Sequence, residues 1–339
     1  MLAVQSQDLP GAKWAIAQRC APTTDDAIDA LLDAGGLIRT HVMRPTWHIV
    51  LPRDLRWLLA LTAPRVHRLD AARRRQLELD DALLKRCRKL IVGELRDGNA
   101  RTRSELGALL ERNRIATRDN RLAHILMHNE LDAIICSGPR SGAHLTYVLV
   151  DERVPATPAR SRDEALATIV AAYFRGHGPA TVHDCAWWSG LRIGDVREGL
   201  ALIGSALSSE SVDGTTYWMA TDAGPARASR PLVHLLPNFD EHIVAYRNHA
   251  PSLDPAIVWT RDVISDRLAP HIVAIDGLAI GGWRRVNGAH ETVVELALGR
   301  RIDAREERAL ARAGEELAEF LGTAVRMVEG VSVARARSV

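Results

Sequence analysis

The sequence of 339 residues contains few cysteines, and none of them form a close pair. Its four cysteines are far apart in the chain: Cys20, Cys87, Cys136 and Cys185. The C-x-x-C spacing of zinc sites and iron–sulfur clusters is therefore missing, and so is the dense pattern of a disulfide framework. We predict a protein of a reducing compartment, with no metal and no cofactor.

Long apolar runs are also missing. No stretch reaches the length that crosses a bilayer, and the first residues lack the charged-then-apolar pattern of a signal peptide. Apolar residues make up 47% of the chain and charged residues 25%, which is ordinary globular composition. We therefore expect a soluble cytoplasmic protein with no membrane partner.

The sequence also lacks a strong excess of positive or negative charge. The formal net charge is +2, which is too small to indicate a nucleic-acid-binding protein by itself. Arginine and lysine nevertheless gather between Arg65 and Arg103, whereas acids gather around Glu315, Glu316 and Glu319. Such a distribution permits a basic face that contacts phosphates, although a solvated helix surface explains it equally well.

The first part of the chain has the pattern of a winged helix-turn-helix without its first helix. Asp8, placed before Leu9 and Pro10, predicts a helix start in which the Asp8 side chain caps the helix. The predicted elements are a helix to about Arg19, a helix over 25–34, and strands over 37–43 and 47–51.

Two further stretches show the same order of helices followed by a hairpin. In the second, Arg140 lies at the tip of the predicted hairpin, as either a DNA contact or a solvated loop arginine. In the third, Asp213-Gly214 predicts a tight hairpin turn, and Asp184 an N-cap. We expect Trp187 and Trp188 to pack this third stretch, with stacking on DNA as the alternative.

Beyond about Ala220, short strand-like runs alternate with turn signals. Asp276-Gly277 and Asn287-Gly288 have the chemistry of tight hairpin turns, and a capped helix is predicted over 303–321. The tail from Val331 is expected to be disordered. The predicted fold is α+β, mainly α, with three tandem winged helix-turn-helix units and a small β-barrel domain that ends in a helix. The predicted boundaries are 1–78, 79–152, 160–222 and 228–330.

Five segments in this order resemble the AlkZ/YcaQ-type winged-helix DNA glycosylases, a bacterial family. The segments are Val4–Asp8, similar to a Gln-x-Gln catalytic motif, Met43–His48, similar to an Arg-x-Thr-x-His signature, Gly178–Leu191, Leu235–Glu241 with Tyr246-Arg247, and Gly281–Arg285. Two features depart from the family pattern. Ser6 stands where an aliphatic residue is usual, and four residues precede Gln5 where a longer segment usually supplies the first helix.

The resemblance implies hydrolysis of the N-glycosidic bond of alkylated bases in double-stranded DNA. An N7-alkylated purine is already cationic, so its departure requires mainly a positioned water and dipoles that stabilise an oxocarbenium-like sugar. The motif assigns that role to Gln5 and Gln7, which alternation in an extended segment would place on one side. Asp8 is either a general base or the helix cap.

The resemblance places Arg44 and His48 near the same surface, on the DNA backbone. For His48, a hydrogen-bonded core residue is an equally good interpretation. The alternative function is a non-catalytic winged-helix DNA-binding protein or a transcription regulator, which would be a dimer on a palindromic site. The sequence shows no long dimerisation helix and no sensor domain, so we expect a monomer.

Overall fold

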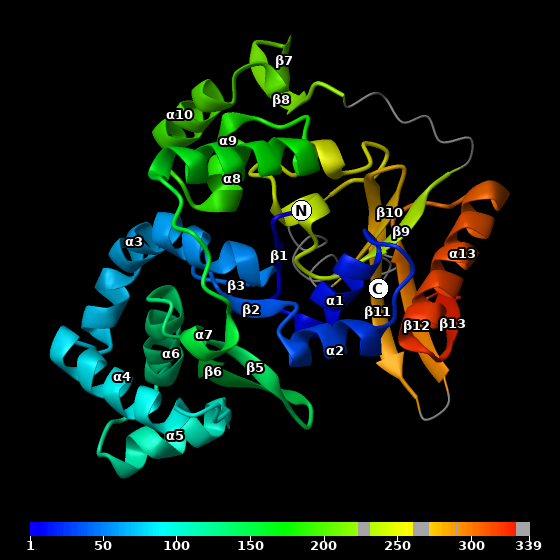
Figure 1. Cartoon of the computed structure of the whole chain (residues 1–339). Helices are drawn as coiled ribbons and strands as arrows, with labels where there is room; N and C mark the ends of the chain where they lie inside the picture. The colour runs from blue at the N-terminus through cyan, green and yellow to red at the C-terminus, as the bar shows by residue number, and fades with distance from the viewer. Residues whose placement is uncertain (223–230, 260–270, 289–290, 330–339) are drawn as a thin grey trace. The chain divides into compact units, whose positions relative to one another are not determined.

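The computed structural model describes residues 1–222, 231–259, 271–288 and 291–329, and about half of these are helical (Figure 1). The chain divides into two compact units. The first unit consists of Met1–Ser6 and Asp29–Thr221, and the second of Gln7–Ile28 and Asp222–Val339. Residues 7–28, which we assigned to the first winged helix, thus group with the C-terminal part. The division into four domains stays a prediction.

The first unit begins with a small antiparallel sheet. Its strands are β1 (Ala3–Gln5), β2 (Ile38–His41) and β3 (Trp47–Val50), in the order β1-β3-β2. The two predicted strands are confirmed as β2 and β3. Gln5 at the end of β1 pairs with His48 of β3, and His48 in turn pairs with Thr40 of β2. Because paired residues of an antiparallel sheet share one face, these three polar side chains lie on the same face.

The pairing of β1 with β3 continues one residue beyond the end of β1. The amide of Ser6 donates to the carbonyl of Trp47 at 2.8 Å, and the Arg39 guanidinium donates twice to the Ser6 carbonyl, at 3.1 and 2.9 Å. Arg39 also lies 4.4 Å from the centre of the Trp47 ring system. Burial lowers the pKa of Arg39. The backbone of the Gln-x-Gln segment is therefore held firmly as far as Ser6.

A long helix that the sequence analysis did not anticipate follows this sheet. It is α3 (Pro52–Gln76), with Pro52 in its first turn and Pro64 inside it. The elements after it are α4 (Asp81–Leu95), β4 (Arg101–Thr102), α5 (Arg103–Arg112), α6 (Arg121–Leu131), β5 (Ile135–Ser141), β6 (His144–Leu149) and α7 (Val150–Arg153). The strands form a sheet in the order β4-β6-β5. Helix α5 begins with a capping box formed by Thr102 and Glu105.

The last part of the first unit contains α8 (Arg162–His177), α9 (Val182–Ser189), α10 (Ile193–Ile203), the short 3₁₀ helix η1 (Gly204–Ala206), β7 (Leu207–Val212) and β8 (Thr215–Ala220). The predicted hairpin turn is confirmed, since Asp213 and Gly214 both have positive φ between paired strands. The prediction for Asp184 is wrong in position. Thr181 is the N-cap of α9, and Asp184 is the third helical residue of its capping box.

The second unit contains a curled five-stranded sheet in the order β13-β12-β11-β10-β9. Its elements are α1 (Leu9–Ala17), the start of α2 (Asp25–Ala34), β9 (Val233–Leu236), α11 (Glu241–Val244), η2 (Ala250–Ser252), β10 (Ile272–Ile275), β11 (Leu278–Asn287), β12 (Glu291–Leu298), α13 (Ala304–Leu321) and β13 (Ala324–Glu329). The sheet runs through the yellow to red part of Figure 1. β12 and β13 are parallel, because α13 carries the chain back between them.

The turn chemistry of this unit agrees with the sequence. Asp276 and Gly277 have positive φ in the two-residue turn between β10 and β11, which confirms the predicted hairpin. Asp303 caps α13 with Glu306, and Gly322 ends it with a positive φ. Strands β9 and β13 are the edges of the sheet among the described residues, so closure into a barrel is not confirmed. The tail from Val331 lies outside the described residues.

Helix α1 is fastened to the rest of the second unit by two polar contacts. The Trp14 indole nitrogen donates to the carbonyl of Leu235 at 2.7 Å, and its ring lies 5.1 Å from that of Phe320. Arg19 donates to both carboxylate oxygens of Asp240, at 2.9 and 2.6 Å. No helix in the described ranges is both long and apolar enough to cross a membrane.

Two fully buried serines of the first unit allow a matched test of hydrogen bonding. The Ser6 hydroxyl finds no hydrogen-bond partner among the described residues, whereas the Ser189 hydroxyl donates to the Cys185 carbonyl at 2.6 Å. A buried polar group without a partner costs about 1–3 kcal/mol. We therefore expect Ser6→Ala to raise the free energy of unfolding by about 1 kcal/mol and Ser189→Ala to lower it by a similar amount. Urea denaturation of both variants checks this, and equal losses of stability would contradict it.

Candidate active site

Gln5 is held at the end of β1 by an arginine from the loop between β2 and β3. One guanidinium nitrogen of Arg44 donates to the Gln5 side-chain oxygen at 2.6 Å. Gln5 is only 7% exposed. Because arginine can only donate, this contact fixes which end of the carboxamide is oxygen. The structure thus joins two of the residues that the sequence singled out, Gln5 and Arg44.

His48 lies beside Gln5 in the sheet and is completely buried. Its Nδ1 atom lies 3.0 Å from the carbonyl oxygen of Thr46. Between the two interpretations of His48, this geometry favours the hydrogen-bonded core residue. Thr40 was not among the predicted site residues, and its buried hydroxyl has no hydrogen-bond partner in the described part of the chain. The strand register pairs Thr40 with His48. The one signal in the sequence for this placement is the alternation of side chains along β2.

The second half of the motif lies beyond the strand, where the chain enters the second unit. Gln7 is exposed, and Asp8 is half-buried at the N-cap position of α1. The cap interpretation of Asp8 is correct for its position, but its carboxylate accepts no hydrogen bond from the first turn of α1, all of which the structure describes. The carboxylate instead folds over Gly11, where an added Cβ would lie 2.7 Å from Oδ2.

Asp8 also acts on a histidine of the second unit. Burial lowers the pKa of His271, and the negative charge of Asp8 opposes this shift. The Nδ1 atom of His271 accepts a hydrogen bond from the Asn238 amide at 2.9 Å. A carboxylate at a helix N-terminus is stabilised by the helix dipole even without a cap hydrogen bond. The Asp8 carboxyl group therefore lies at the start of α1, directly after the motif in the chain.

The two adjacent tryptophans of α9 have different environments. Trp188 is fully buried, with its ring 5.2 Å from that of Tyr173, which confirms the packing role. Trp187 is 48% exposed, so the same prediction is wrong for this residue. The Arg44 guanidinium carbon lies 5.8 Å from the centre of the Trp187 ring system. The Trp187 ring therefore lies within the range of a cation–π interaction with Arg44, the residue that donates to Gln5.

A close backbone approach fixes this arrangement. Gly190, at the end of α9, has a φ of +71°, and an added Cβ would lie 2.3 Å from the carbonyl oxygen of Met43. Only glycine fits there without displacing the loop that carries Arg44. The close contact at Gly190 thus holds the end of α9 against the loop between β2 and β3, and this places Trp187 of α9 near Arg44 of the loop.

Arg140 lies at the predicted hairpin of β5 and β6, but its guanidinium has partners inside the first unit. It forms ion pairs with Asp33, at 2.8 Å, and with Asp29. The hydrogen bond from the Arg140 side chain lowers the pKa of Asp33. Any DNA contact by Arg140 would therefore compete with two carboxylates of the first unit.

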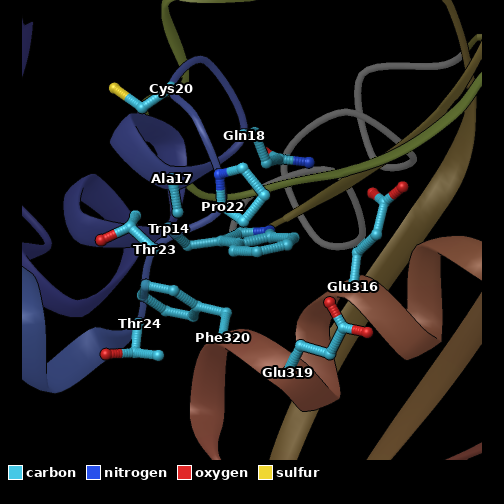
Figure 2. A pocket seen from close by; sticks show the side chains of 10 residues that line it. All are labelled: Trp14, Ala17, Gln18, Cys20, Pro22, Thr23, Thr24, Glu316, Glu319 and Phe320. Carbon is cyan, nitrogen blue, oxygen red and sulfur yellow. The ribbon is translucent and has the colours of Figure 1, made fainter.

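A cavity of about 460 Å³ lies in the second unit, between α1 and α13 (Figure 2). Trp14 and Phe320 form an aromatic patch in it, and Glu316 and Glu319 project from α13. Two carboxylates repel phosphate, so this cavity is unsuited to the DNA backbone. None of the site residues predicted from the sequence line it.

The fold and the protein family are defined by comparison with known proteins. The fold is that of DNA glycosylase AlkZ from Streptomyces sahachiroi, with a TM-score of 0.76 and 24% identity, covering 96% of this chain and 91% of that one. A family model described as "DNA glycosylase AlkZ-like" matches residues 1–320, so the chain belongs to this family of DNA glycosylases. It is also 24% identical over 306 residues to an interstrand DNA cross-link repair glycosylase of S. sahachiroi, covering 84% of this chain and 80% of that protein.

The ion pairs of Arg140 predict a measurable effect on stability. Arg140→Ala removes a cation from the carboxylate of Asp29, whose side chain is 8% exposed, and should lower the free energy of unfolding by about 1–3 kcal/mol. Arg118→Ala is the control, because Arg118 is 85% exposed and 3.9 Å from an exposed aspartate. It should cost less than about 0.5 kcal/mol.

An acid titration of the same two variants tests the cause. The pKa of Asp33 is lowered in the folded state, so the stabilisation is present above the usual aspartate value of about 3.9 and is lost as the pH falls through the lowered one. The difference between the unsubstituted protein and Arg140→Ala should therefore shrink below about pH 4. A difference that stayed constant would mean that packing, not charge, holds Arg140.

Proposed function

We propose that this glycosylase hydrolyses the N-glycosidic bond of alkylated purines in duplex DNA, with a water positioned by Gln5 and Gln7. The single observation that carries the proposal is the contact between Arg44 and the Gln5 side-chain oxygen. A carboxamide held by a charged donor in a buried position is preorganised, which is what a water-positioning group requires. We infer simple hydrolysis to an abasic site, with no covalent enzyme–DNA intermediate.

The chemistry suits amide groups because little acid–base work is required. An N7-alkylpurine leaves as a neutral base from a cationic substrate, and positive charge develops on the sugar. Carboxamide oxygens present partial negative charge to that sugar and orient a water at any pH. Since an amide oxygen accepts up to two hydrogen bonds, the contact with Arg44 is compatible with one to a water.

Gln7 and Asp8 complete the proposed site. The support for Gln7 is its spacing from Gln5 and the family match, which begins at residue 1. Asp8 is the alternative base, since its carboxylate makes no cap hydrogen bond in α1. We favour the glutamines because a cationic substrate, whose purine leaves as a neutral base, does not need a strong general base, and because Gln5 is the residue that the fold holds in place.

The proposed substrates are N7-alkylated purines, including bulky adducts and interstrand crosslinks. The relative from S. sahachiroi is named for cross-link repair, which supports this class. We propose that the duplex backbone is contacted by Arg44, whose planar guanidinium carries five donors in a geometry that suits phosphate oxygens. The ion pairs of Arg140 and the burial of His48 oppose a direct DNA contact by either side chain. The enzyme is proposed to act as a monomer.

The first experiment removes both carboxamides. Gln5→Ala combined with Gln7→Ala should abolish release of N7-methylguanine from duplex DNA and leave duplex binding within a few-fold, because binding and water positioning use different groups. Single-turnover base release and fluorescence anisotropy measure the two properties. Asp8→Asn is the matched control and should retain base release.

The opposite outcomes identify the alternatives. Loss of activity in Asp8→Asn with activity retained in the double variant would assign the base to Asp8. Borohydride trapping of a protein–DNA adduct would contradict simple hydrolysis. Absence of base release from every alkylated duplex, with tight binding preserved, would favour a non-catalytic DNA-binding protein or a transcription regulator.

The second experiment separates the two roles of Arg44. Arg44→Lys keeps the charge for a phosphate but loses the planar donor that orients Gln5, so base release should fall at least about 10-fold with the salt dependence of duplex binding unchanged. Arg44→Ala should lower both, with the slope of log K against log salt reduced by about one. Arg44→Lys with full activity would show that Arg44 does not position Gln5.

A further inference from the structure

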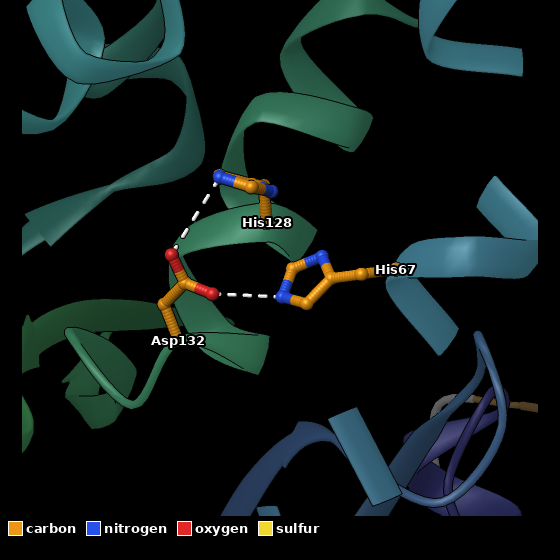
Figure 3. A group of neighbouring side chains, drawn as sticks. All are labelled: His67, His128 and Asp132. Atoms are coloured by element: carbon orange, nitrogen blue, oxygen red, sulfur yellow. Dashed lines mark hydrogen bonds and ion pairs between the residues drawn. The ribbon is translucent and has the colours of Figure 1, made fainter. Parts of the chain in front are cut away.

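A polar cluster lies between α3 and α6 in the first unit, and none of the functions discussed so far uses it (Figure 3). His67 comes from α3, His128 from α6, and Asp132 is the C-cap residue of α6. His128 and Asp132 are four residues apart, which places both on one face of a helix. Helix α3 packs against α6 and brings His67 to that face.

The three side chains converge on a small volume. The Nε2 atom of His67 lies 2.7 Å from Oδ1 of Asp132, and the Nε2 atom of His128 lies 3.6 Å from Oδ2. One atom from each side chain, able to bind a metal, lies within 4.8 Å of the other two. In a tetrahedral site with bonds of 2.0–2.1 Å, the ligand atoms are about 3.3 Å apart. Small side-chain rotations would bring all three to one ion.

We propose that His67, His128 and Asp132 form a binding site for a divalent ion of the Zn²⁺, Ni²⁺ and Co²⁺ class. Two imidazoles and a carboxylate are ligands that suit these ions, whereas Mg²⁺ and Ca²⁺ prefer sets of oxygen ligands. The side chains are 22%, 15% and 27% exposed, so water can complete the coordination. The ion would join α3 to α6 and take no part in base excision.

Nearby cations set the strength expected of this site. Arg88 donates to Oδ2 of Asp132, and its Nε donates to the Asn129 side chain at 3.4 Å. A cation on the same carboxylate repels a divalent ion and competes for its oxygen. Removing Arg88 should therefore strengthen metal binding, which a merely structural hydrogen-bond network would not predict.

The wide spacing of the cysteines led us to predict no metal. The present site uses histidine and aspartate, and His67 is far from the other two ligands in the sequence. Neither the short His128–Asp132 spacing nor the lone His67 marks a site until the helices are packed.

The test uses the full chain without a histidine tag, treated with a chelator and then titrated with Co²⁺ while the visible absorption is recorded. We expect one tightly bound Co²⁺ per chain, displaced by Zn²⁺. His128→Ala and His67→Ala should each weaken binding at least about 10-fold, and Arg88→Ala should tighten it. His144→Ala, in an exposed turn-side position of β6, is the control and should bind as the unsubstituted protein does.

The proposal is overturned if Co²⁺ binds no better to the unsubstituted protein than to His128→Ala, or if Arg88→Ala does not bind more tightly. Circular dichroism identifies a variant that fails to fold, and His128→Asn then replaces His128→Ala. Base release by the chelator-treated protein is measured in parallel and should be unchanged. Loss of base release by the chelator-treated protein would count against the proposed function. Unchanged base release would show that metal binding and base excision are independent.

Discussion

The pairing of β1 with β3 is the constraint on which the candidate site depends. β1 has only three residues, yet it fixes Gln5 opposite His48, and the Ser6 amide extends the pairing to Trp47. Arg39 then holds the Ser6 carbonyl from β2. If this segment were flexible, fixing its backbone so as to orient the carboxamide would cost about 1–2 kcal/mol of conformational entropy for each residue ordered. The sheet and Arg39 offset that cost before any substrate arrives.

This arrangement buries polar groups where an ordinary core would place apolar ones. Gln5, His48 and Thr40 form a polar row across a sheet whose neighbouring row is Ala3, Val50 and Ile38. Burying such groups is costly unless each is hydrogen-bonded, and the hydroxyl of Thr40 has no partner among the described residues. A fold selected for stability alone would replace this row with aliphatic residues. The polarity at Gln5 supports its proposed role in positioning a water.

Local signals in the sequence predicted the local structure well. The capping box of Thr102 and Glu105 and the turn at Asp276-Gly277 follow from the chemistry of adjacent residues. Long-range facts were not accessible in this way. Helix α3 was missed because Pro52 and Pro64 suggest interruption, although Pro52 occupies the first turn, where proline is tolerated. The contrast between Trp187 and Trp188 depends on which face of α9 is covered, and this is set by the packing of other helices.

The number of arginines in a stretch of sequence likewise does not show how much positive charge its surface presents. The basic stretch between Arg65 and Arg103 suggested a phosphate-binding face, but several of its cations have acidic partners: Arg74 with Asp70, Arg88 with Asp132, and Arg101 with Glu94. Others, such as Arg73 and Lys89, are exposed. Arg140 is paired with carboxylates, whereas the contact of Arg44 with Gln5 is to a neutral amide oxygen. How much positive charge the protein presents to DNA therefore depends on which cations the fold pairs with acids, and this pairing cannot be counted in the sequence.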